Sequence, residues 1–195
     1  MKKLIITSLF SILILFTSAQ EFSVNLGLNS TSSSQFWKRS SISAIPGISF
    51  GSSASFDLTY LSKIKVTASY FSNKRKYEYE NSWFYNNTHE TVTINSIKLA
   101  PTFHFMINDE LSIFSGFDYS IPISGKSELI SDSSGVIDTY ELSSFDGTTA
   151  VNFGVSYLLY YMLDFELGCS LLDYRRQNGS SYFDYNLYFT IGYIL

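Results

Sequence analysis

The sequence predicts an all-β chain that folds as an eight-stranded antiparallel up-and-down barrel and crosses a membrane with its strands. Three observations predict this fold. Apolar and polar side chains alternate along several long segments, and the connections between these segments are short and long in turn. The composition is also unusual, because aromatic residues make up 17% of the chain and charged residues only 15%, whereas soluble domains carry about 25% charged residues. Alternation with a period of two indicates β-strands with one apolar face.

The clearest strand is the C-terminal segment from Phe183 to Leu195. Its odd-numbered residues are all apolar: Phe183, Tyr185, Leu187, Phe189, Ile191, Tyr193 and Leu195. A strand places these side chains in one row. The row is longer than the core of a small sheet needs, and a transmembrane β-strand requires about 9–11 residues.

Seven further apolar rows precede this strand. They run through residues 22–28, 48–60, 64–70, 97–107, 111–123, 145–161 and 165–171. One row changes phase, because Val92 and Ile94 lie at even positions whereas the apolar residues from Ile97 onward lie at odd positions. We therefore predict a β-bulge near Asn95 and Ser96.

The connections between the rows alternate in length. In three short connections the flanking apolar residues lie four apart, so we expect three pairs to face each other: Tyr60 and Ile64, Ile107 and Leu111, Tyr161 and Phe165. The long, polar connections cover residues 30–45, 80–89, 124–144 and 175–180. In an up-and-down barrel this order places the short turns and both termini at one end and the long loops at the other.

The apolar side of such a barrel faces either lipid or an internal cavity. A soluble lipocalin-like barrel shows the same alternation with its apolar side inward. The polar positions of segments 49–59 and 146–156 hold mostly small residues rather than Lys and Glu, as the interior of a narrow barrel requires. Several rows also end in tyrosine, which suits the membrane interface: Tyr60, Tyr119, Tyr157, Tyr161 and Tyr193. We expect the apolar side to face lipid.

The first residues read as a secretory signal peptide. Lys2 and Lys3 precede an apolar run, and a small-residue site ends at Ala19. We expect cleavage near Ala19, so that residues 1–19 are the signal peptide and residues 20–195 form one barrel domain. The mature chain then has 11 basic and 17 acidic residues, a formal charge of −6, which makes nucleic acid an improbable partner. Cys169 is the sole cysteine, so the chain forms no internal disulfide.

The inward side is predicted to carry a polar network. Its members are Asp57, Lys65, Lys98, His104, Asp118, Glu166 and Asp184. The expected hairpin registers place Lys98 opposite Ser120 and diagonal to Asp118, and place Asp57 diagonal to Lys65. Buried charges need such partners, so we interpret the network as a charge-compensated plug. A gated polar path is the alternative, and it would run along Arg75, Lys98, Asp118, Asp146 and Asp184.

His104 is the residue that invites a catalytic interpretation. It could share the lumen with Ser112 and with Asp57 or Glu166, the residue types of a Ser-His-acid hydrolase. A lone histidine inside a barrel is more often a hydrogen-bonded filler, and we adopt that interpretation. We therefore predict no enzyme, and no catalytic, metal or cofactor site.

The long loops carry the candidate contact residues. Trp37, Lys38 and Arg39 lie in the first loop, and Trp83 and Tyr85 in the second. Exposed aromatic rings beside cations suit contact with an extracellular glycan, lipopolysaccharide or protein. The alternative is that these residues extend the aromatic belt or cap the barrel mouth.

These features together resemble the small outer-membrane β-barrel proteins of Gram-negative bacteria, in particular the OmpA-like transmembrane domain and the broad outer-membrane β-barrel domain families. The resemblance rests on the leader, the eight rows, the alternating connections and the terminal strand, although such strands typically end on an aromatic residue and this one ends on Leu195. It implies outer-membrane lipids as surroundings, the outer-membrane assembly machinery as a partner during insertion, and a monomer.

The resemblance points to a structural or interaction role, such as membrane integrity, adhesion or an accessory envelope function. A narrow porin or transporter for small solutes is the alternative. A barrel enzyme and a secreted lipocalin-like binder rank below it.

Overall fold

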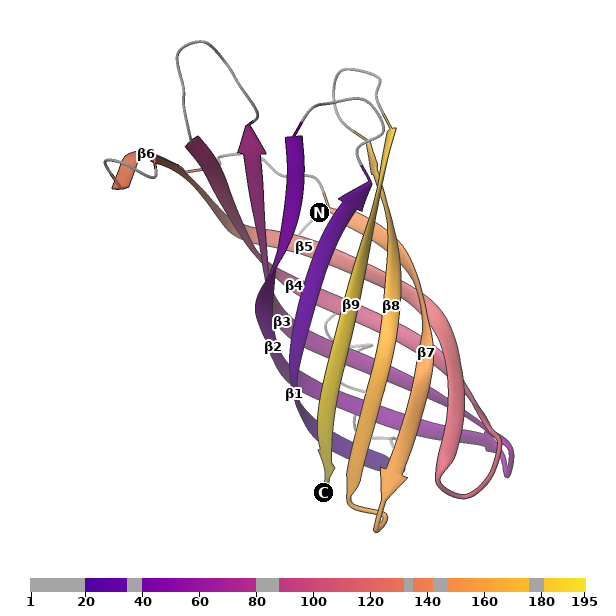
Figure 1. Ribbon diagram of the computed structural model, residues 1–195. Coiled ribbons are helices and arrows are strands. Elements are labelled where there is room, and N and C mark those ends of the chain that lie inside the picture. The colour runs from indigo at the N-terminus through magenta and orange to yellow at the C-terminus, as the bar shows by residue number, and fades with distance from the viewer. Residues whose placement is uncertain (1–19, 35–39, 80–87, 132–134, 142–146, 176–180) are drawn as a thin grey trace, which may run out of the picture.

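The computed structural model describes residues 20–34, 40–79, 88–131, 135–141, 147–175 and 181–195. These residues form nine β-strands, and all but β6 wind around a common axis (Figure 1). The strands are β1 (Glu21–Ser34), β2 (Ser40–Thr59), β3 (Ser62–Tyr79), β4 (Thr88–Met106), β5 (Leu111–Ser131), β6 (Gly135–Glu141), β7 (Thr148–Leu159), β8 (Leu163–Arg175) and β9 (Ser181–Ile194). Within the described ranges, no helix is long and apolar enough to cross a membrane.

Eight of these strands close into an antiparallel barrel. The sheet runs in the order β4-β3-β2-β1-β9-β8-β7-β5-β6, and β4 also pairs with β5, which closes the ring. The strand β6 lies outside the ring, because it pairs with the far half of β5 from Lys126 to Ser131 and forms a projecting hairpin with it (Figure 1). The predicted fold class, an all-β, eight-stranded antiparallel barrel, is confirmed.

The two faces of the barrel wall have opposite polarity. Large apolar side chains are exposed on the outside, for example Leu26 at 67% and Phe117 at 61%. The inward positions hold buried polar residues, among them Asn25, Lys65, His104, Asp118, Asn152, Asp164 and Asn186. In a water-soluble lipocalin-like barrel the apolar side would face inward. The burial pattern therefore excludes the lipocalin-like arrangement.

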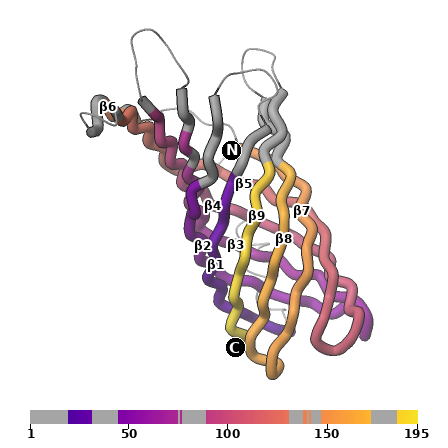
Figure 2. The backbone as a smooth tube through the Cα atoms, viewed as in Figure 1, coloured from indigo at the N-terminus to yellow at the C-terminus, as the bar shows by residue number. Residues whose placement is uncertain are grey.

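The short turns and the C-terminal residue lie at one end of the barrel (Figure 2). The first described residue is at this end too, since the Gln20 N–H donates to the carbonyl oxygen of Ser55 at 3.0 Å. Backbone hydrogen bonds join each turn to the next strand of the ring: Met106 N to Leu61 O, Leu158 N to Glu110 O, and Ile194 N to Met162 O. The predicted grouping is confirmed for the described residues: the short turns, Gln20 and the C-terminal residue lie at one end.

One of the three predicted hairpin registers is correct. Ile107 faces Leu111, and the Ile107 N–H donates to the Leu111 carbonyl at 2.8 Å. The other two are wrong by four residues, because Ile64 pairs with Phe56 and Phe165 pairs with Tyr157. The turns are Tyr60–Leu61 and Tyr160–Met162, so two residues predicted as the last of a strand lie in turns instead. An error of four leaves every side chain on its predicted face.

The predicted irregularity at Asn95 and Ser96 is present, but the extra residue lies in the neighbouring strand. Asn95 pairs with Ser124 and Ser96 with Pro122, which leaves Ile123 of β5 as the additional residue. The pairing of β4 with β3 is continuous through this point. Val92 and Ile94 therefore lie on the same face of β4 as Ser96. The apolar row changes phase because this face is apolar at residues 92 and 94 and polar at Ser96.

The long connections are shorter than predicted, because the strands extend into them. Residues 30–34 and 40–45 belong to β1 and β2, and most of the predicted loop 124–144 is the β5–β6 hairpin. The strand β7 begins at Thr148, and Phe145, where this row was predicted to begin, lies outside the described residues. Polar residues such as Ser and Thr also pair in a sheet, because the ladder is made by backbone hydrogen bonds. These strand ends therefore lack the apolar alternation on which the prediction relied. The projecting hairpin was not predicted.

Candidate functional site: the lumen network

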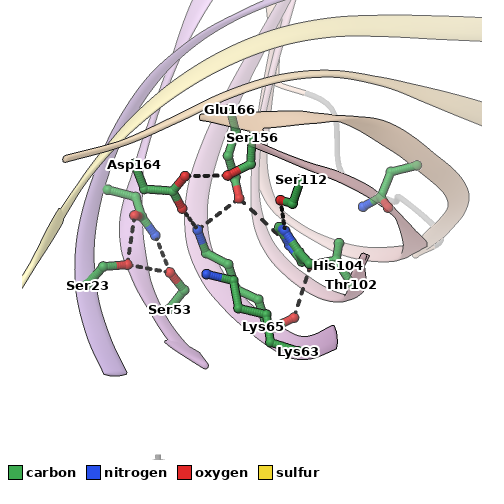
Figure 3. A network of polar contacts seen from close by, with 12 residues as sticks. Ser23, Ser53, Lys63, Lys65, Thr102, His104, Ser112, Ser156, Asp164 and Glu166 are labelled. Atoms are coloured by element: carbon green, nitrogen blue, oxygen red, sulfur yellow. Dashed lines mark hydrogen bonds and ion pairs between the residues drawn. The ribbon is translucent and has the colours of Figure 1, made fainter. Parts of the chain in front are cut away.

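Lys65 lies at the centre of a group of charges near the turn end of the lumen. Its Nζ donates to Asp164 Oδ2 at 2.6 Å and to Glu166 Oε1 at 2.8 Å (Figure 3). The Lys65 side chain is 3% exposed. Lys65 belongs to β3 and the two carboxylates to β8, and β2, β1 and β9 separate these strands in the sheet. The ion pairs therefore cross the lumen instead of joining neighbouring strands.

Further side chains complete the hydrogen bonds of this group. The Ser156 hydroxyl donates to Asp164 Oδ1 at 2.5 Å. At the mouth of the barrel, Lys63 Nζ lies 3.6 Å from Glu21 Oε2. Each buried charge thus has an opposite charge beside it, as the cost of removing charges from water requires.

His104 fills the space beside this group. Its ring is fully buried, its Nε2 lies 3.0 Å from Thr102 Oγ1, and its Nδ1 lies 3.3 Å from Ser112 Oγ. The ring stacks on Phe114 with 5.0 Å between centroids. Glu166 Oε1 is 3.9 Å from Nε2, beyond hydrogen-bond distance. Both ring nitrogens face hydroxyl groups, as a hydrogen-bonded filler requires.

The contact between His104 and Ser112 does not make an accessible hydrolase site. Ser112 is 2% exposed and lies inside the closed wall. A nucleophile must reach its substrate, and these two side chains are covered by the lumen residues around them. Within the described ranges, no group of three or more His, Cys, Asp or Glu side chains is placed to hold a metal ion.

A second group of charges lies farther from the turns. Lys98 Nζ is 2.8 Å from Asp118 Oδ2, and Asp118 also accepts hydrogen bonds from Ser170 Oγ at 2.7 Å and from Asn152 Nδ2. The Lys98 ammonium lies 4.9 Å from the centre of the Tyr188 ring, which suits a cation–π contact. The structure thus brings Lys98 and Asp118 together, with Lys98 opposite Ser120 as the register predicts.

A glycine makes room for the aromatic ring in this second group. A Cβ at Gly168 would lie 2.3 Å from a ring carbon of Tyr188. Real Cβ atoms do not approach other atoms so closely, so a larger residue at 168 would displace the ring from Lys98. The small inward residue and the large inward ring are therefore a matched pair across neighbouring strands β8 and β9.

A cavity of about 50 Å³ separates the two charge groups. Lys98 lines it on one side and Glu166 on another, with Asn152 and Tyr188 beside them. The buried Oδ1 of Asn152 has no hydrogen-bond partner within the protein. A polar space of this size suits a few water molecules, and it is far smaller than the channel of a general porin.

The structure places five residues of the predicted network in the lumen: Lys65, Lys98, His104, Asp118 and Glu166. Asp57 lies opposite Lys63 and diagonal to Lys65, but it is exposed, and the Lys65 ammonium contacts Asp164 and Glu166 instead. The side chains of Asp184 and Arg75 lie outside the described residues, as do Asp146, Trp37, Lys38, Arg39, Trp83 and Tyr85.

Three charged residues of the network were missed by sequence reasoning. They are Glu21, Lys63 and Asp164. A signal for all three was available, because Glu21 shares the inward parity of Asn25, Lys63 that of Lys65, and Asp164 that of Glu166. The prediction paired charges only within hairpins, and that restriction hid the partners across the lumen.

Comparison with known proteins supports the fold. No protein-family model and no curated protein sequence matches the chain. Among solved structures, Ail, the attachment invasion locus protein of Yersinia pestis, matches with a TM-score of 0.53 and 12% sequence identity, over 90% of this chain and 98% of Ail. Neisserial surface protein A matches with a TM-score of 0.55 and 14% identity, over 88% of this chain and 96% of the other. The chain has the fold of these barrels.

A further structure of Ail, in complex with the heparin analogue sucrose octasulfate, matches with a TM-score of 0.51 and 12% identity, over 90% of this chain and 98% of that one. At such low identity the similarity concerns the fold. The resemblance to small eight-stranded outer-membrane barrels is thereby confirmed at the level of architecture.

Proposed function

We propose that residues 20–195 form an integral barrel of the outer membrane of a Gram-negative bacterium, with a structural or interaction role and a closed lumen. The observation that carries the proposal is the polarity of the wall. Leu26, Phe117 and many other large apolar side chains are exposed on the outside while ion pairs are buried inside. A soluble monomer does not leave so continuous an apolar surface in water, whereas a bilayer covers it.

The outer wall has the dimensions that lipid requires. On β5 the exposed apolar residues run from Ile113 to Ile123. Transmembrane β-strands need about 9–11 residues, so this row spans the hydrocarbon core. The next outward residue after Ile123 is Ser124, because Ile123 is the extra residue at which the register shifts. The Ser124 hydroxyl is polar and accepts a hydrogen bond from the Asn95 side-chain amide at 3.0 Å. The apolar row thus ends where the strands enter water.

The test of this proposal is fractionation of the expressed protein, followed by gel migration with and without boiling in detergent. We expect recovery in the outer membrane and heat-modifiable migration, because a closed barrel resists detergent until it is boiled. A monomeric product in the soluble periplasmic fraction would contradict the proposal.

Attachment at the cell surface is the interaction role with the most support. Ail, which has the same fold, is an attachment invasion locus protein and binds a sulfated heparin analogue. In this chain the β5–β6 hairpin projects from the end opposite the short turns (Figure 1). In the sequence, Lys38 and Arg39 fall between Ser34, the last residue of β1, and Ser40, the first residue of β2. Cells that display the chain should bind immobilised sulfated glycan more than a neutral glycan, and Lys38→Ser with Arg39→Ser should reduce binding.

Lys126→Ser is the matched control for this binding experiment, because Lys126 is an exposed cation of the β5–β6 hairpin that already pairs with Glu128 at 2.5 Å. Equal loss with the control and the loop variant would show a general charge effect and contradict a loop site. Equal binding of sulfated and neutral glycans would contradict attachment through sulfate.

A narrow pore is the alternative function, and the cavity beside Lys98 and Glu166 favours it. Planar-bilayer recording separates the two functions. The closed lumen predicts no discrete conductance steps for the intact protein, because ion pairs and a cavity of about 50 Å³ leave no room for a hydrated solute. Reproducible single-channel steps would establish the pore instead.

A further inference from the structure

The turns at the short end of the barrel differ in chemistry. The β2–β3 turn consists of Tyr60 and Leu61, and the β7–β8 turn of Tyr160, Tyr161 and Met162. Tight turns in water usually contain Gly, Asn, Asp or Pro, and neither turn contains any of them. Tyr60 is 90% exposed, Tyr160 82% and Tyr161 74%. The described protein therefore leaves all three rings uncovered.

The β4–β5 turn, by contrast, is polar. Asn108 Oδ1 accepts hydrogen bonds from the backbone N–H groups of Glu110 at 2.9 Å and of Leu111 at 2.7 Å. The Glu110 carboxylate accepts a hydrogen bond from the Tyr157 hydroxyl at 2.7 Å. These contacts are those of an ordinary turn in water. It lies between the two apolar turns around the ring, which are on opposite sides of the barrel.

The backbone of the β7–β8 turn is strained. Tyr160 and Tyr161 have φ values of 51° and 57°, in the left-handed region that residues with a Cβ rarely occupy. The Met162 N–H closes the turn on the Leu159 carbonyl at 3.2 Å, and the Met162 carbonyl accepts from Ile194 N–H at 2.8 Å. These two backbone hydrogen bonds hold the turn in its strained conformation, with both tyrosine rings exposed. An Asn-Gly sequence would form the same turn without strain.

The two apolar turns are continuous with the outer wall. Leu58 precedes the first turn and is 54% exposed, and Tyr157 and Tyr193 flank the second at 41% and 45%. Tyrosine combines an apolar ring with a hydroxyl group and therefore concentrates where hydrocarbon meets headgroups. Exposed apolar residues thus extend from the outer wall onto both turns, which fits the same occupant as the wall.

We propose that the turns Tyr60–Leu61 and Tyr160–Met162 insert into the headgroup region of the leaflet that meets the short turns, and anchor the barrel there at two opposite points. The turn Asn108–Glu110 stays in water. This inference rests on the proposed location in the membrane. It adds that the lipid contact does not stop at the strand ends, and that sequence-distant turns at the same end lie at different depths.

The experiment uses single tryptophans as depth probes. In a background with Trp37→Phe and Trp83→Phe, one tryptophan is introduced as Tyr60→Trp, Tyr161→Trp or Asp109→Trp. Each protein is folded into phosphatidylcholine vesicles that contain lipids brominated near the headgroup, and heat-modifiable migration verifies that the barrel has closed. Asp109→Trp is the matched control, because it probes the polar turn at the same end of the barrel.

We expect brominated lipid to quench the tryptophans at 60 and 161 strongly and aqueous acrylamide to quench them weakly. The tryptophan at 109 should show the reverse. Strong acrylamide quenching at 60 and 161, equal to that at 109, would overturn the anchor. Shielding from both quenchers would overturn it too, since the turns would then be covered by protein instead of lipid.

A fourth variant separates this inference from the proposed function on which it rests. Phe117→Trp places the probe on the outer wall of β5, at a position that is 61% exposed. If brominated lipid quenches the probe at 117 but not those at 60 and 161, the membrane barrel stands and the anchor fails. If lipid does not quench the probe at 117, the membrane location itself fails.

Discussion

The ion pairs of Lys65 provide the sharpest test of the lumen network. Replacing Lys65 with methionine keeps most of the side-chain volume and removes the ammonium that contacts Asp164 at 2.6 Å and Glu166 at 2.8 Å. The two carboxylates then stay in the lumen with their side chains 5% and 13% exposed. Removing one partner of a buried ion pair costs about 3–5 kcal/mol, because the charge left behind has lost its compensation. We expect Lys65→Met to lower the free energy of unfolding by this amount.

The measurement is reversible unfolding in urea from phospholipid vesicles, followed by the fluorescence of the native tryptophans. Lys126→Met is the matched control, because the Lys126 ion pair with Glu128 is exposed, with side-chain accessibilities of 54% and 32%. Surface ion pairs contribute about 0–1 kcal/mol, so the control should unfold almost like the parent.

A compensating variant checks the physical cause. Lys65→Met combined with Asp164→Asn and Glu166→Gln removes the orphaned charges together with the ammonium. We expect this triple variant to recover most of the lost stability, since neutral polar groups are much cheaper to bury than ions. A loss for Lys65→Met no larger than that for Lys126→Met would refute the reasoning. A triple variant less stable than Lys65→Met would do so too.

Three further predictions concern packing, lipid exposure and processing. Gly168→Ala should destabilise the barrel by about 1–3 kcal/mol, as overpacking does, because its Cβ would meet the Tyr188 ring at 2.3 Å; the shift in urea midpoint measures it. Phe117→Arg on the exposed wall should cost about 2–4 kcal/mol in vesicles, the range for arginine on the lipid face near the midplane. N-terminal sequencing of the protein recovered from membranes should begin at Gln20, the residue after the predicted cleavage site.

Each of these has a contradicting outcome. An unchanged urea midpoint for Gly168→Ala would mean that the Tyr188 ring lies elsewhere. If Phe117→Arg is no more disruptive than Phe117→Leu, the wall does not face lipid. An intact leader on the membrane-inserted protein would contradict the predicted processing.

The arrangement of the faces could be predicted from sequence because it depends on parity alone. Alternation places Leu26 outward and Asn25 inward whatever the neighbouring strand does. The register of the β4–β5 hairpin was predictable for a second reason. Its turn contains Asn108 and Asp109, residues with a known preference for turns, so its position along the chain was marked.

The other two hairpin registers lacked such a mark. The turns at Tyr60–Leu61 and Tyr160–Met162 contain apolar residues that continue the strand pattern, so the sequence places the turns too late. The observed register still leaves Asp57 diagonal to Lys65, because Asp57 faces Lys63. The Lys65 ammonium nevertheless contacts Asp164 and Glu166 across the lumen instead.

The true partners of Lys65 follow from closure of the barrel. Closure places β3 and β8 across the lumen from each other, and parity states only that their residues face inward. Which side chains meet across the lumen is decided only when the ring closes, and the register of a single hairpin does not determine it.

The contact between β3 and β8 also constrains the order in which the barrel is built. Asp164 and Glu166 follow Lys65 by 99 and 101 residues. When the chain is added from its N-terminus, Lys65 is present long before Asp164 and Glu166. An intermediate that lacks β8 therefore has the Lys65 ammonium on its lumen face without these two carboxylates. Closing the ring at that stage would bury the ammonium without these partners, which costs free energy. The last hairpin to arrive therefore neutralises the interior, so the electrostatics of the lumen favour closure around the complete set of strands over closure around a shortened one.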